Sequence, residues 1–400
     1  MLNKSIIILL IVFFSITSQA KINSGETGNS REGDQFELAQ EDIDWMRTAT
    51  IKQLEGCRVP GAGGTWIYTP DGIGNYKALW TRDFYYMVEF AGDLINKEEI
   101  KASIYYLMSG QRADGCMPDR VNAEGKPIYS PGAPGKPLAD HALDNAPFMA
   151  MLVSSYVTQH NDGQLFRELE PKLRKGMEHI RRKESGLVYN NPNDPQCVYG
   201  FTDIVKKTGE LLFSSLLFYK ACNDMAQLCL EYKSGDPAFY KKQSALIGQT
   251  IDKLWDEKSG MFLAATNNCR QIDIWGSAYA VEVGITSPEQ TKKITEYLID
   301  NYNEIVMRGQ VRHLPGTDSK WQQLFIACPE GTYQNGAYWA TPLAWFIPVI
   351  SRGNKELANK MLKTVIHDFR ENGINECINE NYLKVPNFVV SAASVYSLTR

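Results

Sequence analysis

The feature that most constrains this chain is a regular alternation of two kinds of predicted helix. One kind is amphipathic, with a charged face and an apolar face, and the other is apolar on nearly all sides. The apolar segments begin near residues 83, 144, 209, 275, 336 and 387, so they recur about every 60 residues. The amphipathic segments alternate with them and comprise residues 38–56, 96–111, 164–183, 236–257, 287–305 and 354–370.

This alternation predicts six helical hairpins. A helix that is apolar all round needs cover on every side, whereas an amphipathic helix needs cover on one face only. An inner ring of apolar helices inside an outer ring of amphipathic ones satisfies both needs. We therefore predict an all-α fold, an (α/α)6 toroid barrel, that forms a single domain over residues 38–400, with short strands only in loops near 64–68 and 309–313.

Two helix starts support this assignment. Asp236-Pro237 and Ser287-Pro288 each combine a side chain that caps a helix with a proline at the first helical position. Both pairs stand at the beginning of a predicted outer helix.

The first twenty residues predict a secretory signal peptide. Lys4 precedes an apolar run from 6 to 16, and the small residues Ser18 and Ala20 suit a cleavage site. The run is shorter than the roughly 20 residues that span a bilayer. Residues 21–37 are polar and predict a flexible leader. We expect a secreted or periplasmic protein with no membrane span.

Charge and cysteine content exclude several partners. The formal charge is −4 and no long run of like charges occurs, so a nucleic-acid partner is not expected. The eight cysteines permit disulfides, but Cys222 and Cys229 fall in an apolar helical pattern that favours buried thiols. No cysteine or histidine spacing typical of zinc occurs, so the sequence predicts neither a metal nor a cofactor. It does not indicate an oligomeric state.

The loops that enter the inner helices should converge at one end of such a ring. These loops are rich in carboxylates, amides and aromatic rings, the groups that bind sugar hydroxyls and stack on sugar faces. Two carboxyls across such a cleft can act as the acid and base of glycoside hydrolysis. The candidate residues are Trp80, Arg82, Asp83, Asp144, Asn145, Asp203, Lys207, Glu210, Trp275, His313, Trp321, Asn335, Tyr338, Trp339 and Glu376.

Several of these residues also have a purely structural explanation. Asp83 and Asp144 stand at predicted helix starts, where an aspartate often caps the helix. Trp80, Trp275 and Trp339 could pack in the core. Asp203 and Glu376 are different, because each lies well ahead of its helix in a segment that needs no acid for capping.

Four segments resemble the six-hairpin glycosidases in their order and spacing. They are LWTRDFYYMVEFAGDLI, GFTDIVKKTGELLFSSLLFYKA, EGTYQNGAYWATPLAWF and GINECINENYLKVPNFVVSAASVYSL. The resemblance is greatest to the catalytic domains of glycogen-debranching-type α-glucosidases, trehalases and glucoamylases. It implies that Arg82 and Asp83 hold the terminal sugar and that Glu210 binds sugar. It also implies that Asp203 is the general acid and Glu376 the general base, with Glu380 as the fallback base.

The resemblance implies an inverting glycoside hydrolase that is exo-acting on α-glucosides or short α-linked oligosaccharides. Protonated Asp203 would donate to the leaving oxygen while ionised Glu376 activates a water, with the carboxyls about 6.5–9.5 Å apart. We expect Lys207 to bind substrate or to pair with Glu210. The segment Phe201-Thr202-Asp203 departs from the Trp-Asp that often surrounds the acid in these families, which leaves the substrate open.

Three alternatives remain for a ring of this kind. The chain could be a non-catalytic carbohydrate-binding protein. It could be an unsaturated-uronide hydrolase that uses the Asp144-Asn145 segment. It could also be a sugar epimerase, for which His141 and His313 are the available histidines.

Overall fold

Six helices that are buried on nearly all sides contact one another in a closed cycle. The computed structural model describes residues 36–133 and 135–400, so the predicted signal peptide and most of the leader lie outside the described residues. Each helix of the cycle packs on the next, and the last packs on the first. In order they are α2 (Thr81–Ala91), α4 (Asn145–His160), α6 (Leu212–Tyr232), α8 (Ile274–Glu282), α11 (Leu343–Gly353) and α13 (Val389–Tyr396).

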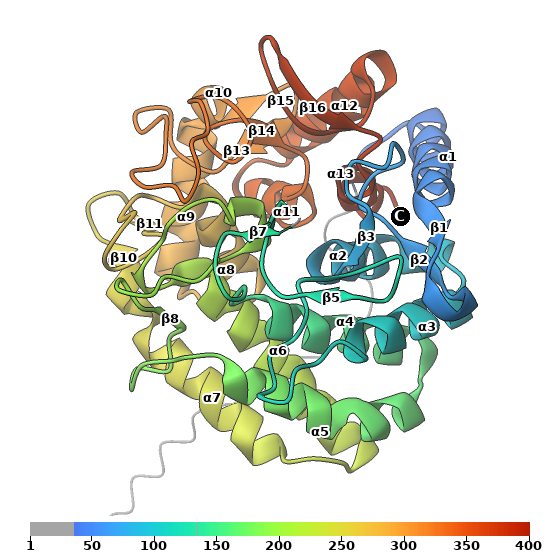
Figure 1. Ribbon diagram of the computed structural model, residues 1–400. Helices are drawn as coiled ribbons and strands as arrows, with labels where there is room; N and C mark the ends of the chain where they lie inside the picture. The colour runs from blue at the N-terminus through green and yellow to red at the C-terminus, as the bar shows by residue number, and fades with distance from the viewer. Residues whose placement is uncertain (1–35, 134) are drawn as a thin grey trace, which may run out of the picture. The chain divides into compact units, whose positions relative to one another are not determined.

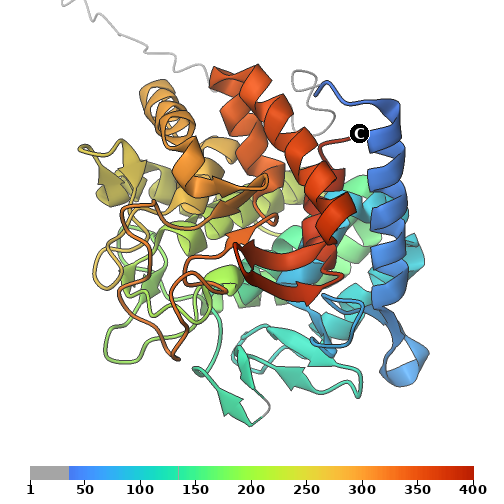
Figure 2. The same cartoon turned by 90° about the horizontal axis from the view of Figure 1, so that it is seen from above.

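Each predicted amphipathic segment contains a helix that packs on the outside of this cycle (Figures 1 and 2). Helix α5 lies against α4 and α6, α9 against α8 and α11, and α12 against α11 and α13. Helices α1, α3 and α7 pack on α13, α4 and α6. The outer helices are α1 (Gln40–Cys57), α3 (Lys97–Met108), α5 (Gly163–His179), α7 (Pro237–Thr250), α9 (Pro288–Asp300) and α12 (Lys355–Asn372), and a short α10 (Tyr302–Ile305) follows α9.

The two predicted helix starts are confirmed. The Asp236 carboxylate accepts from the backbone N–H groups of Ala238 and Phe239, and Pro237 opens α7. Ser287 and Gln290 form a capping box at the start of α9, with Pro288 in the first turn. These contacts satisfy backbone N–H groups that a helix end leaves without partners.

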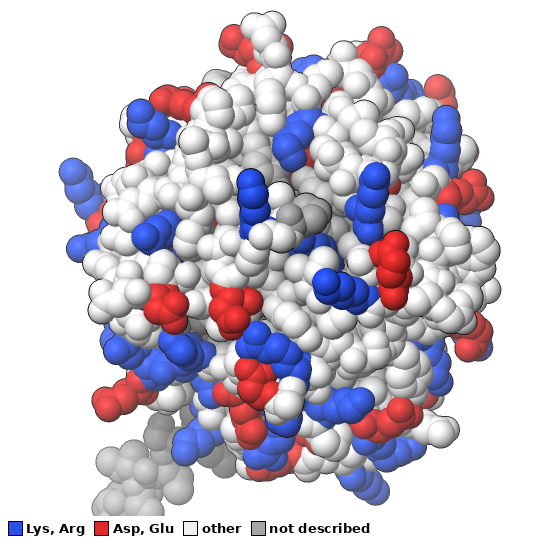
Figure 3. All heavy atoms as spheres, viewed as in Figure 1, with Lys and Arg blue, Asp and Glu red and all other residues white. Residues whose placement is uncertain are grey.

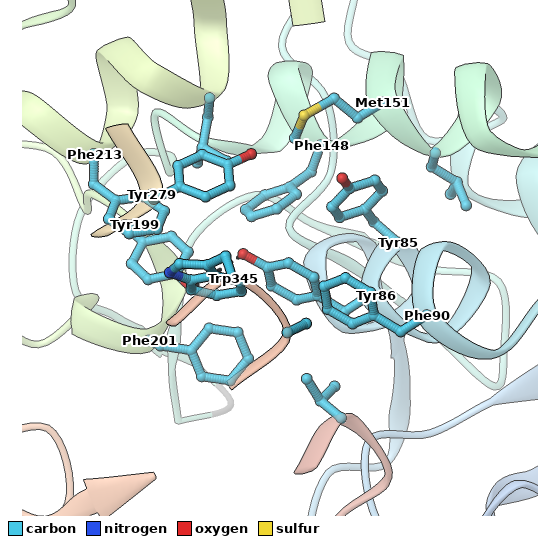
Figure 4. Close-up of a cluster of buried hydrophobic side chains, with 14 of the residues drawn as sticks. Tyr85, Tyr86, Phe90, Phe148, Met151, Tyr199, Phe201, Phe213, Tyr279 and Trp345 are labelled. Atoms are coloured by element: carbon cyan, nitrogen blue, oxygen red, sulfur yellow. Dashed lines mark hydrogen bonds between the residues drawn. The ribbon is translucent and has the colours of Figure 1, made fainter. Parts of the chain in front are cut away.

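Aromatic rings fill the centre of the inner cycle. Figure 4 shows them gathered from different inner helices and the loops between them. The ring of Phe213 on α6 stacks on Tyr199, with 3.8 Å between centroids, and on Tyr279 of α8 at 5.1 Å. Trp345 of α11 stacks on Tyr86 of α2 at 5.9 Å. Stacked aromatic pairs add to the free energy gained by burying their area, so this cluster ties four inner helices together.

The fifth inner helix begins later than predicted. The apolar segment from residue 336 was expected to be helical throughout, but α11 starts only at Leu343. Pro342 explains the boundary, because a proline keeps the preceding residue out of the helical region of the backbone. Tyr338 and Trp339, ahead of it, form a strand instead.

Small antiparallel sheets cover one end of the cycle. The largest has the strand order β12 (Val306–Met307), β13 (Gln310–Arg312), β14 (Tyr338–Trp339), β15 (Asn375–Asn379) and β16 (Tyr382–Pro386). A second sheet joins β3 (Ala78–Trp80), β4 (Arg120–Asn122) and β5 (Pro127–Ile128). The other strands are β1 (Arg58–Pro60), β2 (Trp66–Tyr68), β6 (Gly132–Ala133), β7 (Lys136–Pro137), β8 (Tyr189–Asn190), β9 (Gly209–Glu210), β10 (Trp255–Asp256) and β11 (Met261–Phe262).

Only β2 and β13 correspond to the strands predicted from the sequence. The other strands are two to five residues long, too short to show a period of two. The missed strands are important because β3 and β15 carry candidate site residues.

The surface viewed in Figure 3 carries charges of both signs, and the cysteines are unpaired. Figure 3 shows basic and acidic side chains interspersed over the face viewed. All eight cysteines lie in the described residues and are free thiols, and all but Cys328 are buried. Within the described part of the chain no helix combines the length and apolarity needed to cross a membrane.

We predict that Phe213→Ala lowers the free energy of unfolding by about 3–5 kcal/mol, because it removes a buried ring and leaves a cavity among stacked aromatics. Urea unfolding followed by circular dichroism measures this change. Leu230→Ala is the control on the same helix, since that side chain is 49% exposed and its loss should cost less than about 1 kcal/mol. Equal effects of the two substitutions would contradict the assignment of Phe213 to the centre of the core.

Candidate active site

Loops at the sheet-covered end of the inner cycle line a pocket of about 300 Å³, a volume that includes space open to solvent. Its walls come from the start of α2, from the short 3₁₀ helix η3 (Gly200–Thr202), from β15 and from the residue before α13. With Tyr333 from a further loop, the chain builds one site from five stretches that are distant in the sequence. The lining residues are Pro70, Tyr76, Trp80, Arg82, Asp83, Gly200, Phe201, Asp203, Tyr333, Glu376 and Phe388.

Five of the predicted site residues line this pocket together. Trp80, Arg82 and Asp83 belong to the W-T-R-D segment, Asp203 follows η3, and Glu376 lies on β15. The two carboxyls that the sequence singled out as acid and base thus share one pocket. Their position follows from the loop geometry expected for the ring, in which segments ahead of inner helices meet at one end.

The guanidinium of Arg82 links three carboxylates at the base of the pocket. Its Nη1 donates to Oδ1 of Asp119 at 2.5 Å and its Nη2 to Oδ2 of Asp203 at 3.3 Å. Its Nε lies 3.7 Å from Oδ2 of Asp83. The other oxygen of Asp119 accepts from Arg120 at 2.6 Å. Arg82 was expected to hold a sugar directly. It lines the pocket while its two Nη atoms donate to protein carboxylates and orient them, so its contact with a sugar stays a prediction.

Gly200 allows this arrangement. A Cβ at residue 200 would lie 1.9 Å from both Cδ and Nε of Arg82, closer than atoms can approach. Any other residue at this position would displace the guanidinium and with it the carboxylates that it orients.

The Asp203 carboxyl is held at both oxygens. Oδ1 accepts from Nε2 of Gln334 at 2.9 Å, and Oδ2 accepts from Arg82. Burial raises the pKa of Asp203 to about 6, although Arg82 and the Gln334 hydrogen bond favour the ionised form. A raised pKa keeps a proton on this carboxyl to a higher pH than on an exposed aspartate.

The Glu376 carboxyl has a different environment. It is 3% exposed, its Oε1 accepts from the Tyr76 hydroxyl at 2.7 Å, and its Oε2 accepts from Nζ of Lys384 at 2.7 Å. Burial raises the pKa of Glu376, whereas the positive charge and hydrogen bonds of Lys384 and the hydroxyl of Tyr76 act in the opposite direction. Two donors aimed at its oxygens stabilise the carboxylate form.

Asp83 and Asp144 are buried carboxyls rather than helix caps. Neither makes a side-chain capping hydrogen bond at the start of α2 or α4. Burial raises the pKa of each to about 7, with Arg82 opposing the shift in both. Asp83 lines the pocket, whereas Asp144 lies behind it, where its Oδ2 accepts from the backbone N–H of Gly200 at 2.7 Å.

Lys207 and Glu210 do not line the pocket and do not pair with each other, contrary to expectation. Lys207 is buried, donates to Oγ1 of Thr202 at 3.0 Å and lies 3.8 Å from Oδ2 of Asp273. Burial lowers its pKa. Glu210 ends β9, accepts from the Ser185 hydroxyl and lies 3.3 Å from Nζ of Lys253. The loop between them turns the two side chains to different partners.

Trp275, His313 and Trp339 are packed behind the pocket wall rather than exposed in it. Trp275 stacks on His313 with 3.6 Å between ring centroids and donates to the carbonyl of Val311. Trp339 donates to the carbonyl of Tyr333 and packs against its ring at 5.5 Å. These rings are buried, so they support the wall and do not present a face to a ligand in the pocket.

The other predicted residues also lie outside the pocket. Asn145 donates to the carbonyls of Met117 and Tyr129, and the Tyr338 hydroxyl donates to the carbonyl of Glu304. Trp321 and Asn335 line a separate, wider hollow with about 860 Å³ of empty space. Asn335 is fully engaged there, because it accepts from the backbone of Trp321 and donates to the carbonyl of Cys328.

The sequence did not point to Tyr76, Phe388 or Lys384 as site residues. Tyr76 and Phe388 are pocket-lining aromatics, and Lys384 binds Glu376 from β16. A usable signal existed for Lys384, because residues 375–386 have the two short arms and polar turn of a hairpin. Tyr76 lies in an irregular loop that gave no such signal.

The described residues contain no group of three or more His, Cys, Asp or Glu side chains arranged to hold a metal ion. The arrangement that they do contain is an acidic pocket with aromatic walls. Carboxyls that face one cavity can exchange protons with a bound molecule and with water.

No protein-family model matches the sequence, and no curated protein matches it either. Solved structures do share its fold. A rhamnosidase from Klebsiella oxytoca with rhamnose bound superposes with a TM-score of 0.66 at 14% identity, over 90% of this chain and 64% of that chain. A GH63 mannosylglycerate hydrolase from Thermus thermophilus, in complex with glucose, also has a TM-score of 0.66, at 16% identity, over 89% of this chain and 100% of that chain.

A third similar structure is a GH78 family rhamnosidase from Bacillus, with a TM-score of 0.60 at 14% identity, over 91% of this chain and 35% of that chain. This chain therefore spans less than two thirds of the rhamnosidases and the whole of the mannosylglycerate hydrolase. At these identities the likeness establishes a shared fold.

We predict that Asp144→Asn becomes progressively more stable than the native chain as the pH rises from about 4 to about 7. The folded carboxyl has a pKa of about 7, above the value of about 3.9 in an unfolded chain, so the folded state binds more protons in this interval. The native chain therefore loses free energy of unfolding as the pH rises. Asp144→Asn does not lose it, because the asparagine side chain does not titrate. The gain should be on the order of a few kcal/mol and should level off above pH 7.

Urea unfolding of both proteins at several pH values between 4 and 8 measures this difference. A difference that is the same at every pH would show that Asp144 does not change its protonation on folding.

Proposed function

We propose that the closed cycle of helices is an (α/α)6 barrel and that this chain is a glycoside hydrolase. The observation that carries the proposal is the pocket itself, in which Asp203 and Glu376 meet although they are far apart in the sequence. Support comes also from the shared fold with a mannosylglycerate hydrolase and two rhamnosidases. The resemblance of four sequence segments to six-hairpin glycosidases implies the same two carboxyls as acid and base.

The shape of the site supports an exo-acting enzyme. The pocket is small, about 300 Å³ even when the space open to solvent is included, which suits a single terminal sugar better than an extended chain. Tyr76, Trp80, Phe201, Tyr333 and Phe388 supply aromatic surface around it. We infer that the pocket receives the terminal sugar of a glycoside, with the leaving group outside. An α-glucoside is the substrate implied by the resemblance.

We assign the general acid to Asp203. Its burial and its neighbouring carboxyls keep it protonated to a higher pH than an exposed aspartate, and Arg82 and Gln334 fix its orientation. A proton on this carboxyl passes to the glycosidic oxygen as the bond to the anomeric carbon breaks. The carboxylate that remains is stabilised by the same two donors.

We assign the general base to Glu376. In its ionised form it takes a proton from a water molecule that attacks the anomeric carbon from the face opposite the leaving group. Tyr76 and Lys384 hold the carboxylate in place. Such a direct displacement by water inverts the anomeric configuration.

The geometry favours this assignment over the two other enzymes considered. The epimerase alternative needs a histidine in the pocket, but His313 is buried against Trp275 and His141 pairs with Asp140 outside the pocket. The uronide-hydrolase alternative needs Asp144, which lies behind Gly200. A carbohydrate-binding protein would need no carboxyl pair, so activity measurements separate it from a hydrolase.

We predict that Asp203→Asn and Glu376→Gln each lower kcat by at least about a hundredfold while KM changes little, because each keeps the shape of the side chain and removes a proton transfer. Glu380→Gln is the control, since Glu380 is exposed and does not line the pocket. Release of sugar from nitrophenyl α-glucosides, α-mannosides and α-rhamnosides and from mannosylglycerate is the measurement. Activity that survives both substitutions, or no hydrolysis of any such glycoside by the native chain, would refute the proposal.

We also predict that the first product of an α-glycoside is the β-anomer. A single displacement by water gives inversion, whereas a covalent intermediate would give retention. Proton NMR of the reaction in its first minutes distinguishes the anomers before they interconvert. Initial release of the α-anomer would exclude the roles assigned to Asp203 and Glu376.

A further inference from the structure

Lys384 makes a set of contacts that the assignment of acid and base does not require. It lies on β16 and is paired in register with Cys377 on β15, next to Glu376. Its Nζ donates to Oε2 of Glu376 at 2.7 Å and to the Tyr76 hydroxyl at 2.9 Å. Its ammonium also lies 3.6 Å from the centre of the Tyr333 ring.

These contacts form a closed triangle around the base. Tyr76 accepts from Lys384 with its oxygen and donates its own proton to Oε1 of Glu376 at 2.7 Å. Both carboxylate oxygens of Glu376 are therefore fixed, one by Lys384 and one by Tyr76. Because the three residues come from β16, β15 and the loop before β3, the triangle also joins the two sheets that flank the pocket.

Several acidic groups lie near Glu376, which makes the positive charge of Lys384 important for keeping Glu376 ionised. The acidic groups that face Glu376 are Asp71 from the loop before β3, Asp83 from α2 and Asp203 after η3. All three oppose its ionisation. Tyr76 and Tyr333 are the neighbouring hydroxyls, and the charge of Arg82 is already shared among Asp83, Asp119 and Asp203.

Within the described residues, Lys384 is the one cation that forms an ion pair with Glu376. Its side chain is 26% exposed while that of Glu376 is 3% exposed. The Lys384 side chain is thus partly exposed to water, while its ammonium contacts the buried Glu376 carboxylate. A cation that keeps contact with water is desolvated less than a buried one, so the pair gains attraction at a smaller desolvation cost.

We propose that Lys384 is a positioning residue of the hydrolase, which holds Glu376 ionised and aimed at the attacking water, and so sets the acidic limit of the activity. This inference rests on the function proposed above and deepens it. Lys384 does not touch the reacting atoms. It acts through Glu376 and through the orientation of Tyr76.

The test is the pH dependence of kcat/KM for Lys384→Met. Without the ammonium the Glu376 carboxyl binds its proton more tightly, so the acidic limb should move to higher pH by about one unit or more. Activity should then fall more steeply at pH 5 than at pH 7, and the profile should narrow, since the alkaline limb belongs to Asp203. Lys384→Arg keeps the charge and should restore most of the native profile.

Lys126→Met is the matched control, because it removes the same charge from an exposed turn between β4 and β5. It should leave the profile unchanged. Lys384→Gln is a second variant that retains a hydrogen-bond donor without the charge, and the same shift is expected from it if the methionine variant does not fold.

A fall in kcat/KM that is equal at every pH, or no change at all, would overturn the role of Lys384. That result is distinct from failure of the proposed function, which would appear as undiminished activity in Glu376→Gln. An inactive Glu376→Gln together with a parallel profile for the Lys384 variants would leave the hydrolase standing and remove only this inference.

Discussion

The buried guanidinium of Arg82 is the interaction on which the site depends. A charge removed from water is costly unless it is paired and fully hydrogen-bonded. Arg82 is paired with Asp83 beside it on α2, Asp119 ahead of β4 and Asp203 after η3, and it donates hydrogen bonds to the last two. Since these carboxylates come from separate loops, the arginine brings together segments that no regular secondary structure joins. Gly200, which has no side chain, leaves room for the Arg82 guanidinium.

One cation among several carboxyls has a chemical consequence. Asp83, Asp144, Asp203 and Glu376 are all buried near one another, and burial raises the pKa of each. Their neighbouring donors differ. Asp203 shares Arg82 with other carboxylates, whereas Glu376 pairs with the ammonium of Lys384. A pair of carboxyls with unequal neighbours is the arrangement that an acid and a base need in a single site.

The aromatic core behind the pocket gives these groups a rigid support. Phe201 lines the pocket and packs edge-on against Trp339, with 5.7 Å between ring centroids. Its neighbour Tyr199 stacks on Phe213 of α6 (Figure 4). The η3 segment that presents Asp203 is thus attached to the inner helices through its own side chains. The same packing explains why Trp275, in the first turn of α8, and Trp339, ahead of α11, are core residues although both were candidates for contact with a sugar.

The sequence by itself determined the helical character of the chain, the alternation of inner and outer helices and the segments that meet at the pocket. These properties follow from local patterns, since a helix buried on all sides must be apolar on all sides. Asp203 and Glu376 were recognisable because an acid at either position is not needed to cap a helix, whereas the W-T-R-D segment was recognisable by its resemblance to a known motif. Only the tertiary structure decided which polar groups face one another. The pairing of Lys207 with Asp273, the place of Tyr76 beside Glu376 and the reach of Lys384 across a hairpin depend on strands and loops too short to carry a period. The sequence likewise does not distinguish an aromatic residue of the core from one that lines a binding pocket, because only the packing separates the two roles.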